Sequence, residues 1–228
     1  MNHLTSTTTV RLLIVNSFTS LNLMLGLLAL FATLAGVTSV AAWCLLACVV
    51  LDACDGSLAR RWHVTSAFGA QLDSLADMTS FSIASGVLAY YWLQPKVPFV
   101  LVAGASCLYI LSGAIRLARF TATQASEYSP YFQGMPTTTV AAVVATTYLA
   151  VPQIDSLWGL ALVVVLALLM VSVFPYPRLS ELRRCPPWLW LIVLCGILIN
   201  PPWTFWLLSL SYIAVGPLIW LYRRYNAR

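Results

Sequence analysis

Charged side chains are scarce in this sequence, and their scarcity decides the class of protein. Only 8% of the 228 residues are Asp, Glu, Lys or Arg, whereas 61% are hydrophobic and the mean hydropathy is +0.86. A soluble domain carries about 25% charged residues, which help to cover its surface in water. We therefore expect an integral membrane protein, folded as one domain over residues 1–228.

The sequence also lacks the patterns of several other classes. Its net charge of +5 comes from single and paired basic residues between apolar runs, so we expect no nucleic-acid partner. The N-terminus has no charged region ahead of its first apolar run, and we expect no cleavable signal peptide. The six cysteines form no Cys-x-x-Cys motif and no cluster with the two histidines, which argues against zinc and disulfide chemistry.

Long apolar runs make up most of the chain. A helix needs about 20 apolar residues to cross the hydrocarbon core of a bilayer. By that measure the sequence predicts an all-α polytopic bundle of about eight transmembrane helices, at 17–36, 39–60, 71–93, 97–120, 136–152, 156–174, 187–199 and 202–222.

The basic residues predict how these helices are oriented. If both termini are cytoplasmic, eleven arginines fall on the cytoplasmic side and only Lys96 falls outside. Cytoplasmic loops of membrane proteins carry such an excess of Lys and Arg. We therefore expect cytoplasmic N- and C-termini, with the cytoplasmic ends of the second to fifth helices gathered on one face.

Acidic residues number only seven, yet four of them fall within 26 positions: Asp52, Asp55, Asp73 and Asp77. An ionised carboxylate at membrane depth is costly and normally faces a polar cavity, a partner or an ion. Spacings of three and four put each pair on one face of a helix, and the short connection makes the two helices neighbours. Four carboxylates without a Cys or His ligand predict a site for Mg²⁺ or Mn²⁺, with Ca²⁺ as a third candidate, and two ions would neutralise the charge.

Small residues surround these acids, namely Gly56, Ala59, Gly69 and Ala70. Two interpretations stay open for the glycines. They let a bulky ligand approach the helix backbone, or they allow neighbouring helices to pack closely.

Written with its spacing, the acidic segment is Asp52-x2-Asp55-Gly56-x2-Ala59-Arg60-x8-Gly69-x3-Asp73-x3-Asp77. At every fixed position it resembles the signature of the CDP-alcohol phosphotransferase family of membrane enzymes. The resemblance implies a six-helix core within residues 17–180, to which 187–222 would add a C-terminal helix pair. It also implies a transferase that displaces CMP from a CDP-linked lipid with a small alcohol.

The resemblance further implies a role for each signature residue. The four aspartates would hold two Mg²⁺ or Mn²⁺ ions, and Asp77 would also take the proton from the acceptor hydroxyl. Gly56, Ala59 and Gly69 would leave room for the nucleotide, while Arg60 would stabilise its phosphates. Paired metals suit a pyrophosphate substrate. Because no Ser–His or Cys–His pairing is evident, we expect direct displacement without a covalent enzyme intermediate.

Three further segments resemble the phosphatidylserine synthase branch of this family: 19–29, 112–120 and 131–136. In the first, Thr19 and Asn22 are candidate nucleotide contacts, with hydrogen bonding between helices as an equal alternative. In the second, Arg116 and Arg119 are candidates to bind the serine carboxylate or a lipid phosphate. The alternative for both arginines is anchoring of the helix end on the cytoplasmic side.

The expected substrates are therefore CDP-diacylglycerol and L-serine. The resemblance adds a homodimer, surrounded by membrane lipids in a prokaryotic inner membrane, with its active site facing the cytoplasm. Glycerol 3-phosphate or an inositol phosphate is the alternative acceptor, although a phosphate-bearing acceptor calls for more cationic residues. A divalent-cation transporter is a more distant alternative, because the outer halves of the predicted spans lack acids for a through-path.

Overall fold

The computed structural model describes residues 2–62, 64, 66–123, 131–177, 195–196 and 199–226. Helices dominate it, as the sequence predicted: α1 (Asn2–Leu34), α2 (Thr38–Trp62), α3 (Ala67–Asp77), η1 (Met78–Ala84), α4 (Ser85–Leu93), α5 (Phe99–Thr123), α6 (Thr137–Ala150), α7 (Ser156–Val171) and α9 (Pro201–Asn226). The all-α class is confirmed, with the addition of two short strands, β1 (Tyr131–Gln133) and β2 (Pro175–Pro177).

Four of the described helices are long and apolar enough to cross a membrane, namely α1, α2, α5 and α9. The apolar helices α6 and α7 are shorter. The predicted span 71–93 corresponds to α3, η1 and α4, which follow one another without a break. Most of the predicted span 187–199 lies outside the described residues. The chain is thus a helical membrane protein.

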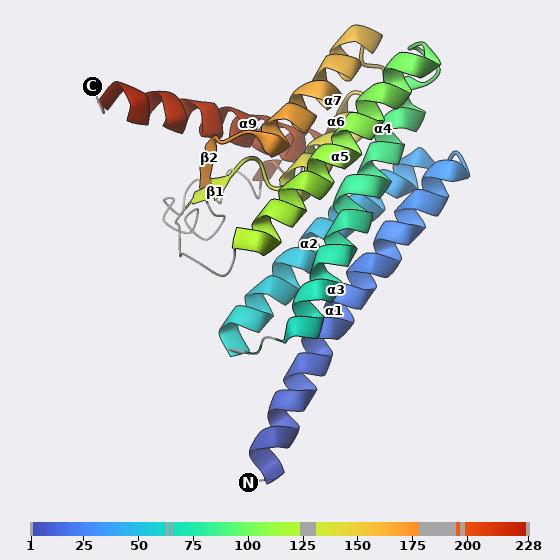
Figure 1. Ribbon diagram of the computed structural model, residues 1–228. Helices are drawn as coiled ribbons and strands as arrows, with labels where there is room; N and C mark the ends of the chain where they lie inside the picture. The colour runs from blue at the N-terminus through green and yellow to red at the C-terminus, as the bar shows by residue number, and fades with distance from the viewer. Residues whose placement is uncertain are drawn as a thin grey trace.

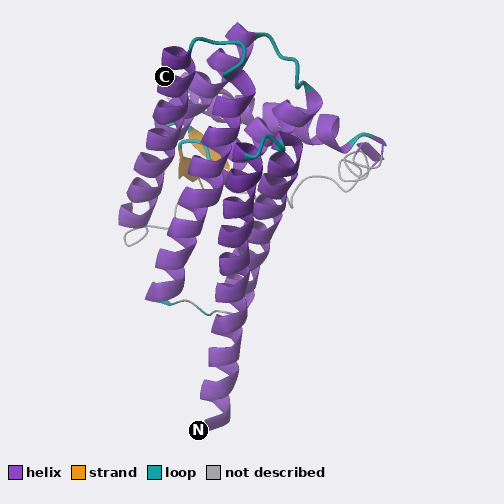
Figure 2. Ribbon diagram, turned by 90° about the vertical axis from the view of Figure 1, so that its right-hand side faces the viewer, coloured by secondary structure: helices purple, strands orange, loops and turns teal. Residues whose placement is uncertain are grey.

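The helices form a bundle in which α1 packs along α2 and α3, and α5 packs along α7. The first turns of α1 extend beyond the rest of the bundle in both views (Figures 1 and 2). The last helix differs in direction, because α9 runs across the other long helices while it packs on α6 and β2 (Figure 1).

The apolar side chains divide between an interior and an outer surface. Fully buried side chains from α2, α4, α5, α6 and α7 form one core cluster, which includes Leu45, Leu88, Tyr109, Val143 and Leu166. Large apolar side chains are also exposed on the outside, such as Phe31 on α1, Val100 on α5 and Leu157 on α7. Extensive exposed apolar surface marks contact with another apolar phase, here the lipid.

The segment η1 is a π-helix that is held tightly between α1 and α5. A Cβ atom on Gly26 would collide with Ser80, and one on Gly113 would collide with Ser82. The Ser80 hydroxyl also donates a hydrogen bond to the backbone carbonyl of Asn22 on α1, at 3.2 Å. Segments of π-helix are frequent at functional sites. This one begins directly after the last of the four aspartates.

The strands β1 and β2 pair antiparallel and lie beside α5 (Figure 1). Gly134 follows β1 with φ of +78°, and a Cβ there would collide with the Met170 carbonyl near the end of α7. The Arg119 guanidinium donates to carbonyls of the same region, including Val171 at 3.2 Å and Gln133 at 3.4 Å. Such bonds satisfy the acceptors that a helix leaves unpaired at its C-terminus.

Candidate active site

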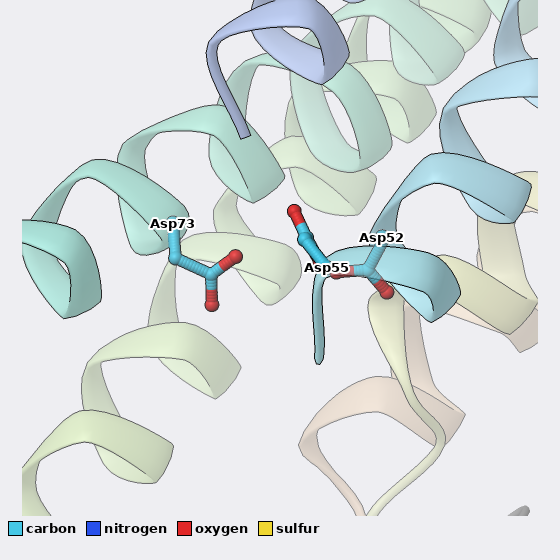
Figure 3. Close-up of side chains that lie close together, drawn as sticks. All are labelled: Asp52, Asp55 and Asp73. Atoms are coloured by element: carbon cyan, nitrogen blue, oxygen red, sulfur yellow. The ribbon is translucent and has the colours of Figure 1, made fainter. Parts of the chain in front are cut away.

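Three of the four predicted metal ligands converge, namely Asp52 and Asp55 from α2 and Asp73 from α3. Each contributes a carboxylate oxygen that lies within 4.8 Å of the others. The Asp73 carboxylate points across the gap toward the other two (Figure 3). Asp55 is 3% exposed, and Asp52 and Asp73 are partly exposed. Carboxylates this close repel one another, and a hard divalent cation between them would offset that repulsion.

The turn between α2 and α3 brings the two acidic pairs together. After α2 ends, the Val64 amide donates to the Ala59 carbonyl at 3.2 Å, which tightens the exit of the helix. Ser66 then caps α3, because its hydroxyl accepts a hydrogen bond from the Gly69 amide at 3.0 Å. The chain therefore turns back within a few residues, and α3 begins near the end of α2 (Figure 1). Asp73, further along α3, then comes close to the acids of α2.

Asp77 lies one turn beyond Asp73 and is not part of the three-carboxylate cluster. Its Oδ1 atom is buried and has no hydrogen-bond partner within the described part of the chain. The charges of Asp52 and Asp73 repel Asp77, and the charge of Arg116 attracts it. A buried polar atom without a partner is costly. Asp77 thus offers an oxygen that a cation or a substrate hydroxyl can satisfy.

Helix α1 supplies two polar side chains to this region. The Thr19 hydroxyl donates to Asp55 Oδ2 at 3.1 Å, so Thr19 forms a hydrogen bond between helices. Asn22 is fully buried, and neither polar atom of its amide is hydrogen-bonded to a described residue. The bond to Asp55 satisfies the Thr19 hydroxyl without any ligand. The Asn22 amide, in contrast, has a donor and an acceptor that a ligand could bind.

We expect Thr19→Ala to weaken Mn²⁺ binding about 10-fold or more, because groups that orient a metal ligand typically contribute about 10–100-fold to affinity. The titration is best done on purified protein in detergent. Thr33→Ala is the matched control, since Thr33 is a buried threonine of the same helix whose hydroxyl donates to the Ala29 carbonyl of that helix at 2.8 Å. Equal Mn²⁺ affinities in the two variants would show that Thr19 does not support the site.

The small residues of the signature have different neighbours. A Cβ on Gly69 would lie 2.8 Å from Asn16 Oδ1, so this glycine allows α3 to approach α1 closely. At Gly56 the nearest group is the Arg60 guanidinium, 3.3 Å from where a Cβ would lie. Arg60 therefore folds back along the helix toward the acids. Ala59 is partly exposed on the same helix. Nucleotide contacts of all four residues stay predictions.

The two arginines of α5 have different surroundings. Arg116 is 8% exposed, donates to the Thr137 hydroxyl at 3.2 Å and lies over the Phe120 ring at 5.9 Å. Its charge interacts with Asp77 and Asp52, which places it on the acidic side of the bundle. Arg119 instead bonds the carbonyls at the end of α7, and that role differs from acceptor binding. A contact between Arg119 and substrate stays a prediction.

Some residues near the site carried no signal in the sequence. Thr137 bonds Arg116 from the first turn of α6, but a threonine at a helix start is ordinary. Ser80 and Ser82 of η1 face glycines on two other helices, and only those tertiary contacts reveal them. Tyr212 on α9 stacks on the ring of Tyr176 in β2, with centroids 5.4 Å apart, although α9 lies far from the acidic segment in the sequence.

Comparison with known proteins agrees with the family resemblance of the sequence. A family model described as CDP-alcohol phosphatidyltransferase matches residues 12–175, which include every predicted site residue but not α9. The CDP-diacylglycerol–serine O-phosphatidyltransferase of Helicobacter pylori strain 26695 is 32% identical over 91% of this chain and 90% of its own. A Methanocaldococcus jannaschii protein of that name is 27% identical, covering 87% and 89%. An archaetidylserine synthase of Methanothermobacter thermautotrophicus is 28% identical, covering 70% and 67%.

Proposed function

The chain belongs to the CDP-alcohol phosphatidyltransferase family, and we propose that it is a CDP-diacylglycerol–serine O-phosphatidyltransferase. It transfers the phosphatidyl group of CDP-diacylglycerol to the hydroxyl of L-serine and releases CMP. The observation that carries this proposal is the cluster of Asp52, Asp55 and Asp73, in a chain of this family that also buries Arg116, whose charge interacts with Asp77 and Asp52. With divalent ions bound, the cluster would suit a pyrophosphate substrate, and the buried cation suits an acceptor that bears a carboxylate.

The four aspartates fit a pair of divalent ions, Mg²⁺ or Mn²⁺. All the candidate donors are carboxylate oxygens, which these hard cations prefer. Three of them lie together, and the fourth residue, Asp77, has a buried oxygen without a described partner. When bound, such ions neutralise the pyrophosphate and stabilise the departing CMP.

The side chains then have separate tasks in a direct displacement. Asp77 accepts the proton of the serine hydroxyl while that oxygen attacks the phosphorus of the phosphatidyl group. The bond from this phosphorus to the bridging oxygen breaks, and CMP leaves with that oxygen. Arg116 and Arg119 bind the acceptor alcohol. The nucleotide lies against residues of α1, α2 and α3, namely Thr19, Asn22, Gly56, Ala59, Arg60 and Gly69.

We further propose that the whole chain, 1–228, is one catalytic domain with a core at 17–180 and an additional helix pair at 187–222. It crosses the inner membrane of a prokaryote about eight times, with both termini and the active site on the cytoplasmic side. The distribution of basic residues supports this orientation, since only Lys96 falls on the outer side. The family resemblance supports a homodimer.

The test of function is CMP release by the purified protein given CDP-diacylglycerol and Mn²⁺ or Mg²⁺. We expect release that depends on L-serine and stays at background with L-alanine, which lacks only the hydroxyl. Glycerol 3-phosphate and an inositol phosphate are compared in parallel. Faster release with either of them would replace serine as the acceptor while the reaction class stands. No release with any acceptor, from folded protein that binds metal, would favour a transporter.

A further inference from the structure

The backbone carbonyl of Asn22 in α1 is bonded by side chains of two neighbouring helices. It accepts a hydrogen bond from the Cys48 thiol of α2 at 3.5 Å and another from the Ser80 hydroxyl of η1 at 3.2 Å. All three residues are fully buried. Ser85 of α4 bonds the Phe81 carbonyl one turn back, as helical serines commonly do, whereas Ser80 reaches a different helix. The carbonyl of Asn22 thus ties α1 to both α2 and η1.

Gly26 lets η1 approach α1 closely enough for this bond. Gly26 follows Asn22 by one turn of α1, and a Cβ atom on it would collide with the Ser80 hydroxyl and lie 2.9 Å from the Ser80 Cα atom. Small residues allow helix backbones in membranes to come this near to one another. Helix α1 therefore cannot slide or rotate against η1 without losing the Ser80 bond.

The side chain of Asn22 lies in the same region without any bond of its own. Neither polar atom of its amide has a hydrogen-bond partner among the described residues, although the residue is fully buried. Such unpaired atoms are costly, and a ligand can satisfy them. Thr19, three residues earlier on α1, donates to Asp55, and Asp52 follows Cys48 by one turn of α2. The Asn22 amide is therefore on a face of α1 that borders the carboxylate cluster.

We propose that Ser80 is a positioning residue, whose bond to the Asn22 carbonyl holds the Asn22 amide where it binds the nucleotide of the CDP-linked substrate. This inference rests on the proposed function, in which Asn22 contacts the nucleotide. Cys48 holds the same carbonyl from α2, but more weakly, because a thiol is a weak donor. Ser80 follows Asp77 by three residues. The helix that carries the proposed base thus also sets the position of a nucleotide contact.

The test is a double-mutant cycle on the binding of CMP, with Mn²⁺ present, to the full-length purified protein. Its variants are Ser80→Ala, Asn22→Ala and the two combined. We expect Ser80→Ala alone to raise the Kd for CMP about 3- to 10-fold, the range for one net hydrogen bond. In the Asn22→Ala background, Ser80→Ala should have less than about a twofold effect, because the backbone carbonyl remains but the amide is gone. Cys48→Ala should weaken CMP binding in the same direction by a smaller factor.

Ser85→Ala is the matched control, since Ser85 is an equally buried serine whose hydroxyl bonds the Phe81 carbonyl and the Tyr109 hydroxyl. This variant should leave CMP binding unchanged. In turnover, Ser80→Ala should raise the KM for CDP-diacylglycerol and leave the KM for L-serine within about twofold, because the contact it supports is made to the nucleotide alone.

Failure of this inference is distinguishable from failure of the proposed function. CMP binding that Ser80→Ala leaves unchanged, or weakens equally with and without the Asn22 amide, would overturn the inference and leave Ser80 with a packing role. If the unmodified protein released CMP with another acceptor, the serine assignment would fail, and coupling between Ser80 and Asn22 would still support the inference. An unmodified protein that bound no CMP with Mn²⁺ would contradict both.

Discussion

Asp55→Asn should reduce CMP release by at least about 100-fold, because bound metals contribute several kcal/mol to the transition state and 1.36 kcal/mol corresponds to a factor of ten. Asp55 is the most buried member of the three-carboxylate cluster and bonds Thr19. Its amide analogue retains the shape but loses the charge and one acceptor oxygen. We therefore expect Mn²⁺ binding, measured by titration of the purified protein, to weaken together with kcat/KM.

Asp155→Asn is the matched control for this substitution. Asp155 is exposed and caps α7, with its side chain accepting from the Leu157 amide at 2.9 Å. Asparagine is an equally good N-cap, so this variant should fold normally and keep activity within about twofold. If Asp55→Asn bound Mn²⁺ as tightly as Asp155→Asn, the cluster would not be the metal site.

Asp77→Asn should differ from Asp55→Asn, because its loss of turnover should be much larger than its loss of metal affinity. A general base contributes about 10²–10⁴-fold to rate, and asparagine cannot accept the proton. The cluster of Asp52, Asp55 and Asp73 is intact in this variant, so Mn²⁺ binding should fall far less than in Asp55→Asn. Single-turnover CMP release and Mn²⁺ titration on the same preparation measure the two effects.

The comparison between these two aspartate variants assigns their roles. Because Asp77 Oδ1 is buried without a described partner, removing its charge should not lower the melting temperature. A variant that is folded, loads metal and turns over slowly identifies Asp77 as the base. Loss of metal as complete as in Asp55→Asn would make Asp77 chiefly a ligand and would leave the base to be found among other groups.

Local spacing is what made the acidic cluster predictable. Residues three or four apart share a helix face whatever the rest of the fold does, so Asp52 and Asp55 face the same way. The short turn to α3 then leaves little freedom in where Asp73 lies. The cluster confirms this convergence for three aspartates, while the metal-binding role of Asp77 stays a prediction.

Features that depend on contacts between residues far apart in the chain could not be predicted from the sequence. Hydropathy measures how long an apolar helix is but not its direction, so it did not predict that α9 lies across the bundle. From the sequence, Arg116 and Arg119 had the same two candidate roles, which were binding of the acceptor or a lipid phosphate and anchoring of the helix end. Their different bonds, one to Thr137 and the other to the end of α7, follow from which helices pack on each face.

The π-helix η1 lies between two halves of what is otherwise one continuous helix. One residue turns an α-helix by about 100°, so a wider turn of even a few residues changes the rotational phase between α3 and α4. Helix α3 must direct Asp73 toward Asp52 and Asp55, and helix α4 must direct Leu88 into the core. Uniform α-helical winding would fix the angle between those two directions by residue count alone. The wider turns of η1 supply the offset, so site and core are brought into register by the winding of the backbone.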